Sequence, residues 1–349
     1  MTSSPPAPFA VRAAGMISGV GNSWPASCAA IRAAVDNFSE TRFIDEGGEW
    51  IIASQVTLDE PWRGREKLLR MAASAIKECL DAAAAKPSIP PSEIPLVLCL
   101  PEESRPGRFE ALDASLIPDI ATLLGVAFHP TSSIVTNGRV GGVVALLAAR
   151  ELFAQGRRAV IVCGTDTFLT APTLAHYEKQ RRLLTSKNSD GFIPGEAAAA
   201  VLLVPHKDAQ PTDLLCTGLA LAREPAPLDS GKPCKGEGLK QAVVAALKEA
   251  NHDITETQYR IADVAGEQFY FREAALMLLG TVRKRVEFYD LWTPFDCTAQ
   301  IGAAAAPAIV SLALAAARKG YAPGPRALCH FANDTDERAA LVLAAGGTP

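Results

Sequence analysis

The sequence predicts a layered α/β fold made of two similar halves. Helical and strand-like patterns alternate along all 349 residues, as expected when helices cover the faces of a sheet. A series of helix, polar break, buried strand and Ala-rich helix occurs in the first half and recurs in the second. The 48% hydrophobic content is enough for a large core, and no apolar run reaches the ~18 residues that indicate a membrane span.

In the first half, the elements follow from local patterns. Ser23 and Pro25 are typical of a helix start, so a helix is expected over 23–35. The strongly amphipathic stretch 65–85 predicts a long helix, which the Pro-rich segment 86–95 ends. The remaining predicted elements are strands over 9–18, 96–100 and 158–166, helices around 117–125 and up to residue 155, and an apolar run over 191–205.

The second half repeats this order. A helix over 238–253, a polar break over 254–258 and a strand over 259–266 match the earlier series. The Ala-rich stretch 302–320 then repeats the helix that precedes residue 155, including its closing basic residue and Gly. Two units, 1–206 and 207–349, are therefore expected.

Composition excludes several kinds of protein. Eight Cys occur without any C-x-x-C pair, so neither zinc nor a disulfide framework is expected. A net charge of -4 without a long Lys/Arg run disfavours nucleic acid and anionic membranes as partners. The N-terminus lacks the apolar run of a secretory signal, so a cytoplasmic location is expected. The glycines of "GMISGVGNSW" do not complete a dinucleotide-binding pattern, and no cofactor is predicted.

Three longer segments carry a family resemblance. They are "GMISGVGNSWPASCAAIRAA" (15–34), "GRVGGVVALLAARELFAQGRRAVIVCGTDTF" (138–168) and "RRLLTSKNSDGFIPGEAAAAVLLV" (181–204). The chain resembles the β-ketoacyl synthases of the thiolase fold across most of its length. The third segment is the most specific, because Asp190, Gly191, Phe192, Gly195 and Glu196 all fall in register. The resemblance implies two α/β halves in an αβαβα arrangement.

The resemblance fails at the residues that would perform the chemistry. The acylated Cys of the family falls on Arg139, within "TNGRVGG". The first active-site His falls on Gly266 or Glu267 and the second on Ala299, while the closing glycine motif becomes "CHFANDTDERAALVL" (329–343). An arginine cannot attack a thioester, and without imidazoles nothing obvious stabilises the enolate of a condensation. A degenerate active site is therefore predicted.

The relic-site positions have alternative interpretations. Arg139 either binds an anion or plugs the acyl tunnel, or it is a structural arginine paired with an acid, for which Glu267 is the first choice. By resemblance, Asp190, Gly195 and Glu196 support the site. Cys297, two residues before the lost His, is a candidate substitute nucleophile, although free Cys is usually a buried apolar residue. The charged run "EKQRRLL" (178–184) is expected to be a solvated face.

Two functions remain open. The first is a non-catalytic binding protein, either a dimer partner of an active synthase, as chain-length factors are, or an adaptor, with acyl carrier protein or a type VI secretion effector as possible partners. The second is an acyltransferase or β-ketoacyl-ACP synthase-type enzyme with a rearranged site. A homodimer or heterodimer burying more than ~2,000 Å² is expected to form through the strand at 158–166.

Overall fold

The first half of the chain alternates strands and helices as predicted, except for a two-stranded hairpin within residues 38–54 that no predicted element covers. Ser23 caps the first helix through a hydrogen bond that its side chain accepts from the Ala26 N–H. The elements in chain order are β1 (Phe9–Ser18), α1 (Trp24–Arg32), β2 (Phe38–Ile44), β3 (Trp50–Ser54), α2 (Gly64–Ala83), β4 (Leu96–Cys99), α3 (Leu112–Leu124), β5 (Ser133–Val135), α4 (Gly141–Ala154), β6 (Val160–Thr167), α5 (Ala171–Lys179) and β7 (Glu196–Pro205).

The second half repeats the same alternation. Its elements are β8 (Leu214–Arg223), α6 (Glu237–Glu249), β9 (Tyr259–Ala262), α7 (Gln268–Thr281), β10 (Asp290–Trp292), α8 (Phe295–Thr298), α9 (Ala305–Lys319), β11 (Arg326–Ala332) and β12 (Glu337–Ala345). The computed structural model describes residues 7–85, 88–284 and 289–346. Parts of the N-terminal segment and of the Pro-rich break, on which two of the predictions rest, therefore lie outside the described residues.

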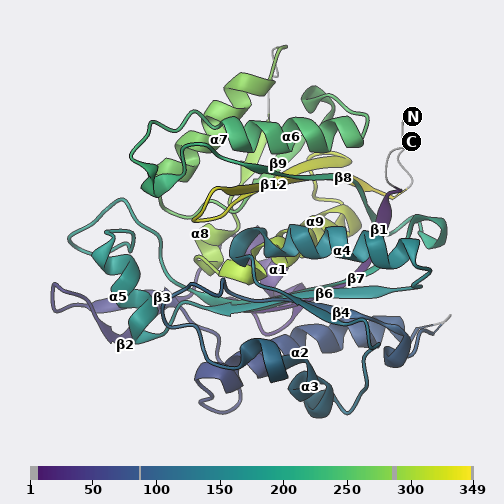
Figure 1. The fold of residues 1–349 in the computed structure, drawn as a ribbon, viewed down its shortest axis with the longest axis horizontal. Helices are drawn as coiled ribbons and strands as arrows, with labels where there is room; N and C mark the ends of the chain where they lie inside the picture. Colours follow the sequence, from purple (N-terminus) through teal and green to yellow (C-terminus); the bar gives the residue numbers. More distant parts are fainter. Residues whose placement is uncertain (1–6, 86–87, 285–288, 347–349) are drawn as a thin grey trace.

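The main sheet shows the internal repeat. Its strand order is β10-β9-β11-β12-β8-β1-β7-β6-β4-β5, so each half contributes five strands in matching positions on either side of the β1–β8 contact. Figure 1 shows α6 and α7 over one outer face, α2 and α3 over the other, and α1, α4 and α9 between the two parts of the sheet. This is the predicted αβαβα thiolase-like arrangement. The proposed division after residue 206 falls between β7 and β8 and stays a prediction.

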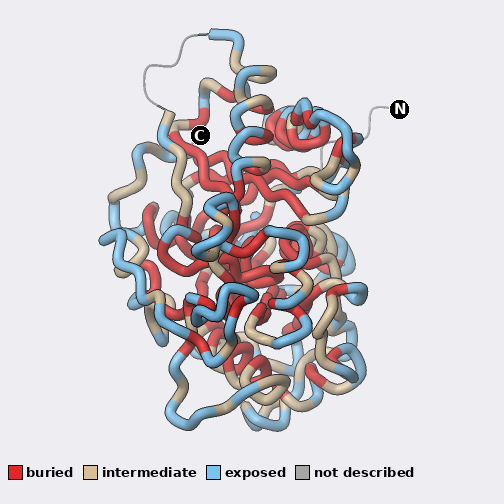
Figure 2. The backbone as a smooth tube through the Cα atoms, turned by 90° about the vertical axis from the view of Figure 1, so that its left-hand side faces the viewer, coloured by how far each residue is buried: buried red, intermediate tan, exposed pale blue. Residues whose placement is uncertain are grey.

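The two central helices approach each other closely. A Cβ added to Gly142 in α4 would lie 2.6 Å from the Cβ of Ala306 and 2.8 Å from Cδ of Pro307 in α9. Each helix follows a 3₁₀ turn, η2 (Gly138–Val140) before α4 and η6 (Gly302–Ala304) before α9. The two turns therefore meet in the middle of the molecule, where Figure 2 shows buried residues concentrated.

The predicted dimer strand is wrong. The segment 158–166 corresponds to β6, which pairs with β4 on one side and with β7 on the other. Its eight residues are all buried, so it has no free edge for a second chain. The strand at that end of the sheet is β5. Among the helices of the described residues, none is long and apolar enough to cross a membrane.

Candidate functional site

Arg139 lies where the resemblance places it, in the turn that leads into α4. Gly138 has φ +49°, and a Cβ there would overlap the carboxylate of Glu102, so this turn requires glycine. Arg139 follows as the middle residue of η2, with 3% of its surface exposed. A cation is thus buried beside the N-terminus of a helix, where it needs compensating negative charge.

Two acids and an aromatic ring surround the guanidinium. Nη2 of Arg139 donates to Oδ1 of Asp334 at 3.0 Å, and Nη1 lies 3.9 Å from Oδ2 of Asp263. The ring centroid of Tyr270 is 4.3 Å from the guanidinium carbon. Burial alone would lower the pKa of Arg139, but its acidic neighbours raise it above its ordinary value. Arg139 is therefore a fixed positive charge.

The expected pair between Arg139 and Glu267 is not formed. Glu267 instead accepts two hydrogen bonds from Arg182, Nε to Oε1 at 2.7 Å and Nη2 to Oε2 at 3.0 Å. Arg182 comes from the charged run that was expected to be solvated, yet only 6% of its surface is exposed. This bidentate pairing is the favoured geometry of a guanidinium with a carboxylate. Arg182 thus compensates the charge of Glu267 without a contribution from Arg139.

Asp334 connects the two arginines. It accepts from Arg139, from Arg182 at 2.9 Å, and from the hydroxyls of Tyr177 at 2.8 Å and Tyr270 at 3.2 Å. Burial would raise the pKa of this carboxyl, but Arg182 and Arg139 hold it well below its usual range. Asp334 lies in the turn between β11 and β12, within the segment that replaces the closing glycine motif. The ion pair therefore joins two residues that depart from the family pattern, Arg139 in place of the Cys and Asp334 in place of the glycine motif.

A second ion-paired group extends the network. Nη1 of Arg105 contacts both carboxylate oxygens of Asp166 at 2.8 Å, and Nη2 donates to Glu102 at 2.6 Å. Asp166 also accepts the N–H of Ala303 in η6 at 2.8 Å. Arg105 is 7% exposed, and sequence patterns did not single it out.

The side chains of this network leave almost no free space. The cavity between them has a volume of about 10 Å³, which is close to the smallest space that holds one water molecule. Its described lining includes three arginines and three acids but neither a histidine nor a cysteine. An acyl thioester therefore does not fit in this conformation.

The positions of the two lost histidines hold no acid or base except Glu267. Gly266 has φ +71°, and a Cβ there would overlap the carbonyl of Gly191. Ala299 is 1% exposed and has φ 60° and ψ -173°, a conformation that is costly for any residue with a Cβ. Its neighbour Gln300 points its amide oxygen at the N–H of Gly302. Among the described residues, neither of these two positions holds an imidazole.

Comparisons with known proteins bear on the fold of the chain. The family model described as "Beta-ketoacyl synthase, N-terminal domain" matches residues 130–209. A structure described as a type II PKS acyl-carrier protein in complex with its ketosynthase aligns with a TM-score of 0.78 at 16% identity, covering 97% of this chain and 100% of the other. The chain therefore has the fold of the ketosynthases.

Two further structures similar to this ketosynthase-like chain contain chain length factors. A ketosynthase in complex with its chain length factor from Xenorhabdus doucetiae aligns with a TM-score of 0.72 at 14% identity, covering 99% of this chain and 100% of the other. The ishigamide ketosynthase/chain length factor aligns with a TM-score of 0.67 at 18% identity, covering 97% and 100%. Comparison with curated protein sequences gave no match. At these identities the likeness establishes the fold.

Cys297 lies apart from the ion-paired network. It is on α8, is 7% exposed, and lines a different cavity together with Trp292 and Tyr321. Burial raises the pKa of its thiol, and the nearby carboxylates of Asp296 and Asp36 raise it further. These surroundings disfavour the thiolate that a nucleophile requires. All eight cysteines are buried and free, as expected of small apolar residues.

The residues expected to support the site make structural hydrogen bonds. Glu196 accepts from the Val56 N–H at 3.0 Å, from the Thr167 hydroxyl at 2.9 Å and from the ammonium of Lys67. Asp190 accepts the N–H of Gln268 at 2.8 Å, at the start of α7 beside Glu267. A Cβ on Gly195 would lie 2.8 Å from the carbonyl oxygen of Thr298, so this backbone approach requires glycine. Their role as supports remains a prediction consistent with these contacts.

One group in the described part of the chain has metal-ligand atoms close together. Ligand atoms of Glu224, Cys234 and Glu273 lie within 4.8 Å of one another. Glu273 already receives Nε of Arg338 at 2.8 Å, and Glu224 accepts the N–H of Gly238 at 2.8 Å. Arg338 supplies the positive charge that a metal ion would otherwise provide, so these contacts give no reason to assign a metal here.

Proposed function

We propose that this ketosynthase-like chain is non-catalytic and acts by binding a protein partner. The observation that carries this proposal is the ion-paired network around Arg139. By resemblance Arg139 lies at the nucleophile position, and its guanidinium, Asp334 and Arg182 line a cavity of only about 10 Å³. Such a buried network is costly to open, because separating one charge from its partners leaves the others uncompensated.

The partner that we propose first is a related synthase, in a heterodimer, with a second copy of this chain as the alternative. Support comes from the similar structures, which are described as a ketosynthase with its chain length factor and as an acyl-carrier protein with its ketosynthase. An acyl carrier protein is a further candidate partner, because one of the similar structures is described as such a complex. An adaptor role, the link to type VI secretion effectors and the cytoplasmic location rest on the sequence and its resemblance alone and stay predictions.

The edge strand β5 is the surface that we propose for this contact. It pairs with β4 on one side. Its residues Ser133 and Ile134 also line a groove of about 480 Å³, in which Ile117 and Phe128 supply apolar surface beside Asp113 and His129. An apolar edge of this kind is suited to pairing with another chain, and a stable contact would bury more than ~2,000 Å² in total.

Native mass spectrometry of the chain co-expressed with ketosynthases of its own genome tests the proposal. The expected result is a dimer whose formation Ser133→Lys weakens, because a charged side chain on an edge strand opposes pairing. Leu279→Lys is the matched control, since Leu279 is 76% exposed on α7 in the other half of the molecule. The proposed surface is contradicted if the chain stays monomeric with every co-expressed ketosynthase, or if Ser133→Lys leaves dimer formation unchanged.

A further inference from the structure

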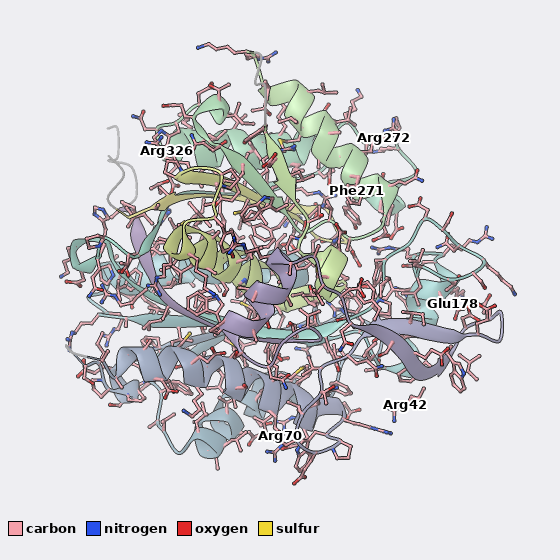
Figure 3. All side chains as sticks on the ribbon, turned by 180° about the vertical axis from the view of Figure 1, so that it is seen from behind. Arg42, Arg70, Glu178, Phe271, Arg272 and Arg326 are labelled. Carbon is pink, nitrogen blue, oxygen red and sulfur yellow. The ribbon has the colours of Figure 1, made fainter. Side chains whose placement is uncertain are left out.

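A second cavity lies between the β2–β3 hairpin and the start of α2. Its volume is about 240 Å³, and it shares no lining residue with the ion-paired network. Three cations line it, Arg42 from the hairpin and Arg63 and Lys67 from α2 and the residue before it. Figure 3 shows Arg42 below the hairpin and Arg70 by α2 on the same side of the molecule.

The cations in this cavity are not balanced by acids. The one carboxylate in the lining is Glu196, and it is bound by Lys67. Arg42 and Arg63 have no carboxylate within ion-pair distance among the described residues, and both are exposed. The cavity thus has two uncompensated positive charges, although the whole chain has a net charge of -4. Such a local excess attracts anions.

The start of α2 adds to this positive potential. Arg63 is the N-cap residue of this 20-residue helix, and no side chain accepts a hydrogen bond at this cap. Gly64 lines the cavity, so the first turn of the helix faces it. Unpaired N–H groups at a helix start carry partial positive charge, so they attract an anion just as the two arginines do.

Aromatic rings form the apolar part of the lining. Phe43, Trp62 and Phe109 come from three separate segments. The guanidinium of Arg70 lies 3.8 Å from the centre of the Trp62 ring and also pairs with Glu66, so the indole is held in place. Rings that are fixed beside free cations suit a flat ligand with an anionic group.

We propose that this cavity binds a small organic anion, a phosphate or carboxylate attached to a flat apolar group. Arg42 and Arg63 pair with the anionic group, and the Trp62 ring contacts the apolar part. The volume suits a small molecule and is too small for a helix or strand of another protein. This inference is independent of the proposed partner protein.

Isothermal titration of the full chain with phenyl phosphate tests the proposal, with benzoate as the carboxylate arm. Phenyl phosphate is expected to bind about tenfold more tightly than phenol or inorganic phosphate, and benzoate about tenfold more tightly than phenol or acetate. Phenol lacks the anionic group, and inorganic phosphate and acetate lack the aromatic ring, so each of these reference compounds loses one of the two contacts. Arg42→Gln and Arg63→Gln are each expected to weaken binding of the better ligand about fivefold or more. Trp62→Leu is expected to weaken binding of the aromatic ligand and to leave binding of inorganic phosphate or acetate unchanged.

Lys77→Gln is the matched control. It removes the same charge from α2, but Lys77 pairs with Asp81 and lies ten residues, about 15 Å, beyond Lys67. The proposal is overturned if Lys77→Gln weakens binding as much as Arg42→Gln, if neither aromatic anion binds in the millimolar range, or if both arginine variants bind normally. A glutamate-rich peptide that binds better than either small anion would overturn it in favour of a protein surface.

Discussion

Replacing Asp334 by Asn removes the charge that connects Arg139 with Arg182. The asparagine has nearly the same shape, but its amide group faces donors where a carboxylate oxygen accepted hydrogen bonds. Breaking a fully buried ion pair costs about 3–5 kcal/mol, and here 28% of the Asp334 side chain is exposed, which lowers that cost. We therefore expect Asp334→Asn to lower the free energy of unfolding by about 2–4 kcal/mol.

Urea denaturation followed by circular dichroism measures this change. Asp336→Asn is the control two residues away, because Asp336 pairs with Arg223 at the surface, where the arginine side chain is 73% exposed. Loss of such a surface pair is expected to change the free energy of unfolding far less, because water and salt screen exposed charges. If Asp334→Asn is no more destabilising than Asp336→Asn, the network does not hold the site together and the reasoning is wrong.

Two further changes probe the same region. Burial raises the pKa of Asp263 to about 6, so its contribution to stability is complete below its unfolded pKa near 4 and is lost as the pH rises through about 6. Asp263→Asn has no carboxyl to titrate, so its free energy of unfolding relative to the parent should increase by about 2–3 kcal/mol between pH 4 and pH 7 in urea titrations. A difference between variant and parent that does not change with pH would refute this prediction. Gly142→Ala should cost about 1–3 kcal/mol by overpacking α4 against α9, whereas Gly141→Ala, whose added Cβ meets its nearest neighbours at 3.7 Å, should be neutral or stabilising in the same thermal melts. Equal melting temperatures for these two variants would show that the helices do not cross as closely as described.

Local patterns were sufficient to predict most helices and buried strands. The amphipathic period of α2 and α6 and the Ala-rich composition of α4 and α9 are properties of neighbouring residues, so they can be read from the chain. The order of strands in the sheet depends on distant segments. For that reason β6 was assigned to a dimer edge although β4 and β7 enclose it.

The site was predicted in part for the same reason. The missing nucleophile and histidines were visible as departures from a motif, and Arg139 is buried with an acid as expected. The acid that pairs with Arg139 is Asp334, whereas Glu267 pairs with Arg182. Local patterns do not indicate this pairing, because Asp334 lies in a turn about 195 residues away in sequence. The signal that would have identified Asp334 was the acidic "ANDTD" in place of a glycine-rich turn, read together with the arginine.

Intact-mass analysis of the chain after incubation with an acyl thioester and a malonyl thioester tests whether the protein is non-catalytic. The parent chain is expected to remain without an acyl adduct, because the side chains around Arg139 leave about 10 Å³ of space. Arg139→Cys is expected to release no condensation product, because neither histidine position holds an imidazole. Cys297→Ser is included to identify the site of any modification. An adduct on the parent chain that Cys297→Ser abolishes, or an Arg139→Cys variant that condenses malonyl thioesters, would contradict the proposal that this chain acts by binding alone.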